Sequence, residues 1–218
     1  MNYGKKSVKQ KKKALQSTSS KLGRKCLLTF SKVLLLCVIA IGIIGICAGL
    51  GVFKGIIDSA PTITLEDATP TRYSSFIYDS KGNQMAKLIA EDSNRVPVTM
   101  DQIPTDLANA FVAIEDERFY QHNGIDIMGI LRAGVTAVKT GFKRQEGAST
   151  ITQQLIKNTV LTTWTQEKTL GERIKRKVQE QYLAIQLEKD TNDKSKILEQ
   201  YMNTINLGQN TLGVQAAS

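Results

Sequence analysis

Several features are scarce or absent in this 218-residue chain, and each absence narrows what the chain can be. The three cysteines, Cys26, Cys37 and Cys47, all lie in or beside one apolar run. The rest of the chain therefore forms no disulfide and no thiolate metal site. The pattern S-x-x-K does not occur, so the sequence lacks this motif for a nucleophilic serine that attacks an acyl group. Acidic residues are missing from residues 1–25.

The basic character of the chain belongs to that N-terminal stretch. The formal net charge is +9, from 29 basic and 20 acidic residues. Residues 1–25 hold the whole excess: Lys5, Lys6, Lys9, Lys11, Lys12, Lys13, Lys21, Arg24 and Lys25. The remainder is neutral on average, so we expect no nucleic-acid partner, although net basicity alone would suggest one.

An uncharged apolar run follows the basic stretch. It covers residues 33–53, flanked by Lys32 and Lys54. At about 1.5 Å per residue, a helix of this length spans roughly the 30 Å of a bilayer core. A cleaved signal peptide is the alternative, but its apolar region is usually shorter, about 7 to 15 residues. The positive-inside rule places the tail in the cytoplasm and the rest outside.

The remainder of the chain reads as a small β element followed by helices. Residues 73–78 and 84–89 are β-prone and flank a turn, which predicts a hairpin. Residues 105–115 place Leu107, Ala110, Phe111 and Ile114 on one predicted apolar face. Further helices are expected over residues 126–140, 149–161, 169–189 and 194–204.

Three segments carry candidate chemistry. The first is the acidic end of the helix over residues 105–115, at Glu115, Asp116 and Glu117. Successive helical side chains point about 100° apart, so these carboxylates do not share one role. Glu115 follows the apolar Ile114, so it is the one expected to enter a partly desolvated cleft and serve as a general base or acid. A solvated acidic helix end is the alternative.

The second segment is the helix start over residues 147–158. Ser149 or Thr150 can cap this helix and leave N–H groups suited to a phosphate. Ser149, Gln153 and Lys157 recur every four residues and would line one polar face suited to pyrophosphate or sugar. An ordinary capped amphipathic helix explains the same pattern.

The third segment is a basic stripe with one carboxylate. Arg173, Arg176, Lys177 and Glu180 share one helix face. These basic residues would bind a diphosphate, with Glu180 holding a divalent cation or orienting the bases. A solvated ion-pair face is the alternative.

In their order, five runs resemble the successive motifs of family 51 glycosyltransferases, the glycan-polymerising domains of class A penicillin-binding proteins and monofunctional transglycosylases. The runs are E-D-E-R-F-Y-Q-H-N-G (115–124), G-A-S-T-I-T-Q-Q-L-I-K-N (147–158), R-K-V-Q-E (176–180), K-I-L-E-Q-Y-M-N (196–203) and G-V-Q-A-A (213–217). The resemblance covers about residues 72–218.

This resemblance implies a mainly α, lysozyme-like glycosyltransferase domain with a small β element near the membrane and a smaller jaw that dips into the outer leaflet. The expected organisation is a basic cytoplasmic tail (1–32), one transmembrane helix (33–53), a linker (54–71) and the domain (72–218). Ser218 falls inside the fifth motif, so the resemblance implies a domain incomplete at its C-terminus. The activity of such a chain alone stays open, as does a penicillin-binding domain further along a longer parent chain.

The resemblance also implies roles for individual residues. Glu115 would be the general base, taking the proton of the acceptor sugar's 4-hydroxyl, while Glu180 would lie near the leaving pyrophosphate and a divalent cation. The implied substrate-binding residues are Arg118, Ser149, Gln153, Gln154, Lys157 and Lys177. The implied structural residues are Asp116, Phe119, His122, Gly124 and Asn203.

The implied reaction joins lipid II units into glycan strands at a single-pass membrane protein whose catalytic domain is extracytoplasmic. The implied partners are lipid II, the growing strand, the membrane and cell-wall assembly or division proteins. Mg²⁺ or Mn²⁺ is the implied cofactor, with no organic cofactor. One departure concerns the spacing of two pairs of residues. Five residues separate Thr169-Leu170 from Arg176-Lys177, where the family pattern has one intervening residue. The four additional residues predict an extra helical turn.

Two other classes compete with this interpretation. A muramidase also uses a catalytic glutamate in a helical domain, but a hydrolase has no pyrophosphate to bind with a basic stripe. A non-catalytic scaffold in a cell-wall complex would fit an incomplete domain, yet it has no need of Glu115 and Glu180.

Overall fold

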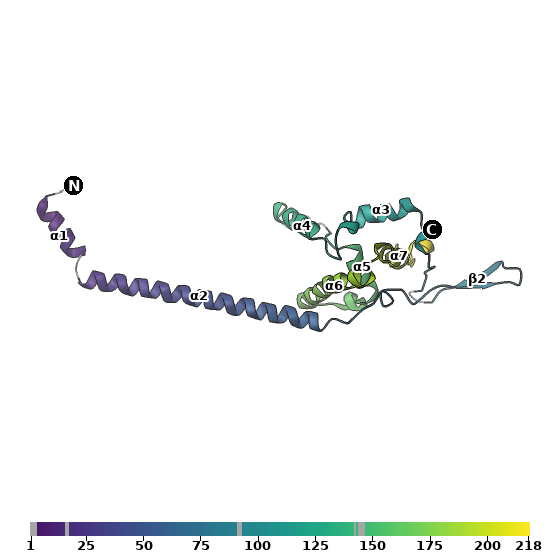
Figure 1. The fold of residues 1–218 in the computed structure, drawn as a ribbon, viewed down its shortest axis with the longest axis horizontal. Helices are drawn as coiled ribbons and strands as arrows, with labels where there is room; N and C mark the ends of the chain where they lie inside the picture. Colours follow the sequence, from purple (N-terminus) through teal and green to yellow (C-terminus); the bar gives the residue numbers. More distant parts are fainter. Residues whose placement is uncertain (1–3, 16–17, 91–92, 142, 144–146) are drawn as a thin grey trace. The chain divides into compact units, whose positions relative to one another are not determined.

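The structure is a computed structural model that describes residues 4–15, 18–90, 93–141, 143 and 147–218 (Figure 1). Residues 1–3 and 16–17 of the predicted basic tail lie outside the described residues. The chain divides into two compact units, residues 1–55 and 56–218, and each is described by itself.

The first unit contains the basic helix α1 and most of a long apolar helix. Helix α1 covers Lys5–Leu15, and helix α2 covers Thr18–Asp58, so α2 extends beyond the predicted 33–53 at both ends. Its stretch Lys25–Asp58 is long and apolar enough to cross a membrane, judged by length and composition alone, and a signal sequence would pass the same test. Its large apolar side chains are exposed, as in Leu36 and Ile44.

The second unit begins with a segment that the sequence suggested was a linker. Ile63 and Ala68 of this segment are buried in the core of the unit, with 3% and 0% of their surfaces exposed. The side chain of Asp67 caps a turn here by accepting hydrogen bonds from the backbone and hydroxyl of Thr64. The segment is therefore packed against the domain, and the compact unit starts at residue 56.

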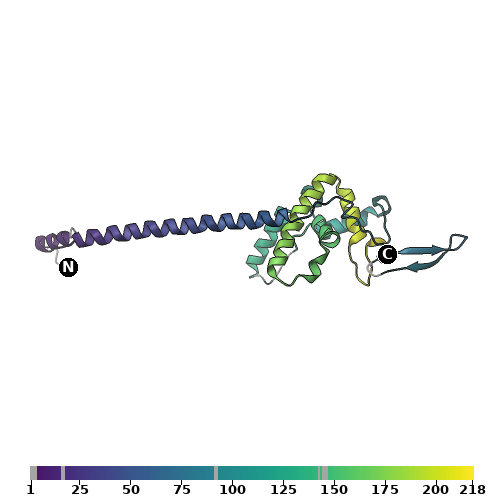
Figure 2. The ribbon, with the colours of Figure 1, turned by 90° about the horizontal axis from the view of Figure 1, so that it is seen from below.

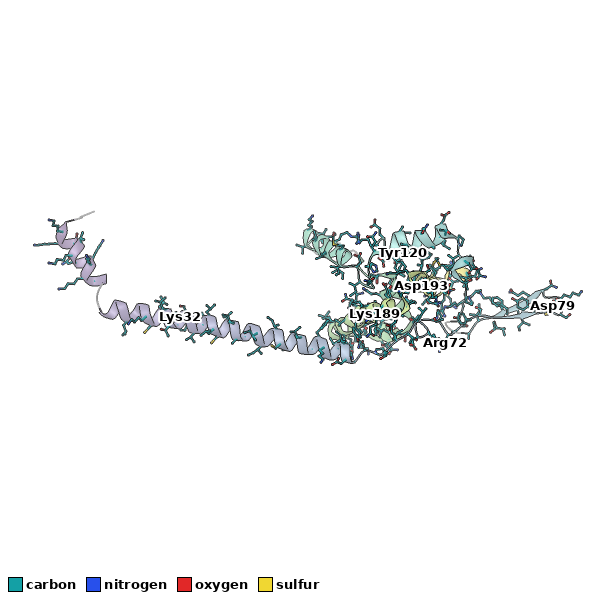
Figure 3. The ribbon with its side chains drawn as sticks, viewed as in Figure 1. Lys32, Arg72, Asp79, Tyr120, Lys189 and Asp193 are labelled. Atoms are coloured by element: carbon teal, nitrogen blue, oxygen red, sulfur yellow. The ribbon has the colours of Figure 1, made fainter. Side chains whose placement is uncertain are left out.

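A two-stranded antiparallel hairpin comes next, as predicted. Strand β1 (Ser75–Tyr78) pairs with strand β2 (Gln84–Leu88), with a bulge after Ile77. Asp79 shapes the turn by accepting hydrogen bonds from the Lys81 and Asn83 backbone N–H groups. The hairpin extends away from the helices, with Asp79 near its tip (Figures 2 and 3).

The rest of the unit is helical and agrees closely with the predicted ranges. Its elements are η1 (Met100–Gln102), α3 (Thr105–Glu115), η2 (Phe119–Gln121), α4 (Ile127–Lys139), α5 (Ile151–Thr159), η3 (Thr162–Gln166), α6 (Leu170–Thr191), α7 (Lys194–Thr204) and α8 (Val214–Ala217). Side chains cap the N-terminal ends of α4, α5, α6 and α7, because Asp and Thr oxygens accept the free backbone N–H groups there. Helix α6 runs without a break through residues 171–175, so the extra residues form the predicted helical turn.

Helix α5 is the centre of the core, between α6 and α7. Ile151, Leu155 and Ile156 of α5 are fully buried, and they pack with Leu183 of α6 and Leu198 of α7 in one cluster. Burial of such side chains contributes about 1.5–3 kcal/mol each relative to exposure. The short α5 is thus held firmly, and its polar side chains keep fixed directions.

A polar cluster joins the same three helices inside the core. Thr152 donates a hydrogen bond to the buried Glu188, and Lys194 Nζ lies 2.5 Å from the other Glu188 oxygen. The Lys194 ammonium also lies 4.5 Å from the ring centroid of Phe119. Because each of these polar groups has a partner, the cluster adds specificity to the packing of α5, α6 and α7.

The predicted apolar face of α3 was right for Phe111, which packs against the core, and wrong for Leu107, Ala110 and Ile114. The buried residues are Ala108 and Val112, whereas Ile114 is 81% exposed and Leu107 is 38% exposed. Ala108 and Val112 are four residues apart and so share one helix face, which leaves Leu107 and Ile114 pointing outward. Glu115 consequently lies at an exposed helix end rather than on the buried side.

Candidate active site

Glu115 is the last residue of α3 and lines a small polar hollow. The hollow has a volume of about 120 Å³ and is also lined by Arg118 and Ser149, two of the predicted substrate-binding residues. One oxygen of the Glu115 carboxylate accepts a hydrogen bond of 3.0 Å from the side-chain amide of Gln154 on α5. The carboxylate is accessible to a substrate and held at one oxygen, which is what a general base requires.

Asp116, the next residue, turns into the protein instead. Its carboxylate is buried, and each of the two carboxylate oxygens lies 3.0 Å from His122 Nε2. It also accepts the backbone N–H of Ile151, the first residue of α5, at 3.0 Å. Asp116 therefore ties the end of α3 to the start of α5, and these contacts fit the predicted structural role of Asp116 and His122.

Phe119, Gly124 and Asn203 occupy packed positions of the same kind. Phe119 is fully buried. Gly124 has φ +85°, and a Cβ there would lie 2.5 Å from the backbone carbon of Ala184. The Asn203 side chain accepts the N–H of Val98 at 2.9 Å and donates to its carbonyl at 2.7 Å. All three hold backbone segments together rather than facing the hollow beside Glu115.

Glu180 is buried in α6 between two cations. Only 1% of the residue is exposed, and its carboxylate is bound by Arg176 through one oxygen and by Lys177 Nζ at 2.9 Å through the other. Arg176 is also held by Glu167 at 2.6 Å. Arg173, which shares the predicted stripe, is exposed. Glu180 thus orients Arg176 and Lys177, one of the two roles that the sequence suggested.

Lys177 links this cluster to the start of α5. Its ammonium lies 2.8 Å from Ser149 Oγ and 3.3 Å from Gln153 Oε1. The Gln153 amide in turn donates to the carbonyl of Gly124 at 3.1 Å. The structure therefore brings Ser149, Gln153 and Lys177 together with Glu180, and the cation keeps 41% of its side chain exposed for an anionic ligand.

The donor set around Glu180 does not fit a resident divalent cation. Both of its oxygens face protein cations, and a metal ion there would have to displace Arg176 and Lys177. Mg²⁺ is usually held by one or two free carboxylates together with substrate phosphates. Within the described ranges, no group of three or more His, Cys, Asp or Glu residues is placed to hold a metal. The divalent cation stays a prediction from the family resemblance.

Arg118 lines the hollow beside Glu115 but is already paired. Its guanidinium binds the Asp126 carboxylate at 3.2 and 2.6 Å. The hydrogen bond from Arg118, and then that from the Gly129 N–H, holds the pKa of Asp126 below its usual range against the opposing effect of burial. The same bond raises the pKa of Arg118. Asp126 also caps α4, so Arg118 is fixed against the start of that helix.

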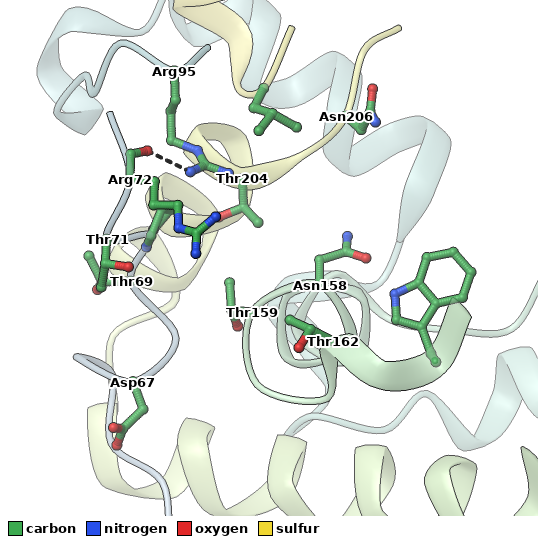
Figure 4. A pocket seen from close by; sticks show the side chains of 13 residues that line it. Asp67, Thr69, Thr71, Arg72, Arg95, Asn158, Thr159, Thr162, Thr204 and Asn206 are labelled. Carbon is green, nitrogen blue, oxygen red and sulfur yellow. Dashed lines mark hydrogen bonds between the residues drawn. The ribbon is translucent and has the colours of Figure 1, made fainter. Parts of the chain in front are cut away.

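Lys157 does not join the Lys177 cluster. Its ammonium lies 4.6 Å from the ring centroid of Trp164, the single tryptophan of the chain. Trp164 lines another cavity of about 580 Å³, whose wall also includes Asn158 and Arg72 (Figure 4). Lys157 and the other predicted substrate-binding residues therefore fall in different parts of the domain surface.

Some residues of the site were missed in the sequence. Asp126 carries a detectable signal, because an acidic residue directly before an apolar helical run is a typical N-cap. Glu167 and Tyr201 gave none, since their contacts with Arg176 and Gln154 depend on how separate helices pack.

Comparison with known proteins agrees with the motif order. Residues 81–218 match the family model described as Transglycosylase. The chain is 46% identical over 171 residues to penicillin-binding protein 1A of Clostridium botulinum, covering 77% of the chain and 20% of that protein. It is 39% identical over 213 residues to penicillin-binding protein 1A of Clostridium perfringens, covering 96% of the chain and 24% of that protein. It is 42% identical over 176 residues to penicillin-binding protein 1A/1B of Bacillus subtilis, covering 81% of the chain and 18% of that protein.

The chain spans about a fifth of the length of these curated relatives. The matched region contains Glu115, Glu180 and the start of α5, so the geometry described above lies within the part that defines the family. The resemblance seen in the five motifs is confirmed: the chain belongs to the transglycosylase family.

Proposed function

We propose that the chain carries peptidoglycan glycosyltransferase activity, polymerising lipid II into glycan strands. One observation carries the proposal: two adjacent residues of α5 contact the carboxylate and the ammonium of the site. The Gln153 side chain contacts the cation Lys177, and the Gln154 side chain contacts the carboxylate Glu115. A base and a cation arranged around one helix start suit a reaction in which a hydroxyl attacks and a diphosphate leaves.

The proposed chemistry follows from these positions. Glu115 accepts the proton of the 4-hydroxyl of the acceptor GlcNAc, and that oxygen forms a bond to C1 of the MurNAc at the end of the growing chain. The bond from C1 to the diphosphate oxygen breaks, so undecaprenyl pyrophosphate leaves and the configuration at C1 inverts. Lys177, held by Glu180 and Ser149, stabilises the negative charge that develops on the leaving diphosphate.

The location proposed is the cell membrane, with α2 as the single span, the N-terminus in the cytoplasm and the second unit outside. The lysines of α1 support this orientation, because basic residues flanking a span favour the cytoplasmic side. Helix α4 supports contact of the domain with lipid, because its apolar side chains are exposed, among them Ile127 at 67%, Leu131 at 58% and Val138 at 71%. An exposed apolar face of this kind typically lies in a membrane interface.

The test uses the protein that carries this chain, purified in detergent and incubated with labelled lipid II, with products separated by length on a gel. Glu115→Gln keeps the shape of the side chain and removes the base. The matched control is Asp106→Asn, which removes an exposed carboxylate that lies in the first turn of the same helix and does not line the hollow. We expect polymer from the wild type and the control, and at least a hundredfold less from Glu115→Gln.

Each other result has a defined meaning. Polymer from Glu115→Gln at the wild-type rate would remove Glu115 from the role of base. A folded wild type that binds lipid II without polymerising it would favour the scaffold. Cleavage of preformed glycan in place of polymerisation would favour the muramidase.

A further inference from the structure

Gln154, the partner of Glu115, is itself held from behind by a buried tyrosine. The Tyr201 hydroxyl, on α7, lies 3.3 Å from Gln154 Oε1, and Gln154 Nε2 lies 3.0 Å from Glu115 Oε2. Tyr201 is completely buried, whereas Gln154 is half-buried and Glu115 is exposed. The three side chains form a line from the core to the accessible carboxylate.

Hydrogen-bond chemistry gives this line a single direction. An ionised carboxylate only accepts hydrogen bonds, so Gln154 must turn its NH₂ group toward Glu115. Its carbonyl oxygen then faces Tyr201, which must act as the donor. Burial, and then the charge of Glu115, raises the pKa of Tyr201, so its phenol keeps its proton at neutral pH. The buried O–H therefore favours the orientation in which the amide oxygen faces Tyr201 and the NH₂ group faces Glu115.

The ring of Tyr201 supports the same carboxylate through the backbone. It packs edge-on against Phe111, with centroids 6.3 Å apart and planes at 77°. Phe111 lies one helical turn before Glu115 on α3, so the ring of Tyr201 contacts the helix whose last residue is the base. One residue of α7 thus contacts α3 through its ring and the Glu115 carboxylate through Gln154.

We propose that Tyr201 is a positioning residue for the transfer reaction, acting through Gln154 to hold the Glu115 carboxylate toward the acceptor hydroxyl. This inference rests on the proposed function and extends it to a residue that touches neither sugar nor diphosphate. A base must meet the hydroxyl within hydrogen-bond reach and in the correct direction, and a freely rotating carboxylate satisfies this condition only part of the time.

Tyr201→Phe removes the hydroxyl and keeps the ring. Its matched control is Tyr182→Phe, which removes a hydroxyl that accepts a 2.7 Å hydrogen bond from Gln186 on α6. We expect kcat to fall about tenfold in Tyr201→Phe, the effect of one lost hydrogen bond, with KM for lipid II within twofold of the wild type. The control should keep both constants. A change confined to KM, or an equal loss in Tyr182→Phe, would overturn the inference.

A double variant tests whether Tyr201 acts through Gln154. If it does, Tyr201→Phe combined with Gln154→Leu is no slower than Gln154→Leu alone, because the second substitution removes a link that is already broken. Effects that multiply would show that Tyr201 acts by another route and would overturn the inference. Gln154 is only half-buried, so the single variant Gln154→Leu, which breaks the same link, is available where a change at the buried Tyr201 lowers expression.

A measurement without substrate separates this inference from the proposed function. The NMR signal of the ¹⁵N-labelled Gln154 side-chain amide should change in Tyr201→Phe and stay unchanged in Tyr182→Phe, because the Tyr201 hydroxyl contacts the amide oxygen. Failure of the wild type to polymerise lipid II would reject the function while leaving this change measurable. Identical Gln154 amide signals in all three proteins would reject the Tyr201–Gln154–Glu115 linkage whether or not polymer forms.

Discussion

The buried carboxylate of Glu180 gives a prediction whose size follows from its surroundings. Glu180→Gln keeps the shape of the side chain and removes the negative charge that Arg176 and Lys177 share. Breaking a buried ion pair by removing one partner costs about 3–5 kcal/mol. Arg176 retains Glu167, and Lys177 is 41% exposed, so we expect the lower end, about 3 kcal/mol.

Thermal unfolding measures this cost. For a domain of this size, about 3 kcal/mol corresponds to a fall in Tm of roughly 6–12 °C. The fluorescence of Trp164, the single tryptophan, reports the transition close to Glu167. Glu117→Gln is the matched control, because its carboxylate is 71% exposed and the change should stay within about 0.5 kcal/mol.

Two results would contradict the expected loss of stability in Glu180→Gln. Equal Tm values for Glu180→Gln and Glu117→Gln would mean that the charge contributes nothing to the fold. A higher Tm for Glu180→Gln would mean that the desolvation of Glu180 outweighs its pairing with both cations.

Further predictions concern the pair at Asp126 and two glycines. The pKa of Asp126 is lowered by Arg118, so its contribution to stability is present above about pH 4 and is lost as the pH falls through the folded-state pKa. The difference in unfolding free energy between wild type and Asp126→Asn should therefore shrink in urea titrations between about pH 5 and pH 2; a constant difference would contradict this. Gly124→Ala places a Cβ 2.5 Å from the Ala184 backbone at φ +85° and should cost more than about 3 kcal/mol. At Gly134 on α4, an added Cβ would have no other atom within 4 Å. Gly134→Ala should therefore raise the unfolding free energy, measured by urea titration, by about 0.5–1 kcal/mol.

The sequence predicted the helices well because their signals are local. Thr169 and Asp193 cap helices that the periodicity had already indicated, and α7 covers the expected residues 194–204. The hairpin was found from its turn residues. The rotation of α3 was missed, because only the packing of Ala108 against other elements decides which face of that helix is buried.

The contacts among the candidate site residues were predicted only in part. The stripe of Arg176, Lys177 and Glu180 is one helix face, so its ion pairs follow from spacing alone. The Arg118–Asp126 pair joins a loop to a helix cap, and the Tyr201–Gln154 contact joins α7 to α5. Such contacts depend on tertiary packing, which no local pattern encodes.

The arrangement around α5 also has a consequence for inhibitor design. Gln153 and Gln154 are consecutive, so their positions on α5 differ by one helical step of about 100° and 1.5 Å. Glu115 belongs to α3 and Lys177 to α6, so α5 is the element that touches both groups. A bivalent compound, with a hydrogen-bond donor for Glu115 and a phosphonate for Lys177, would bind on both sides of this one helix start.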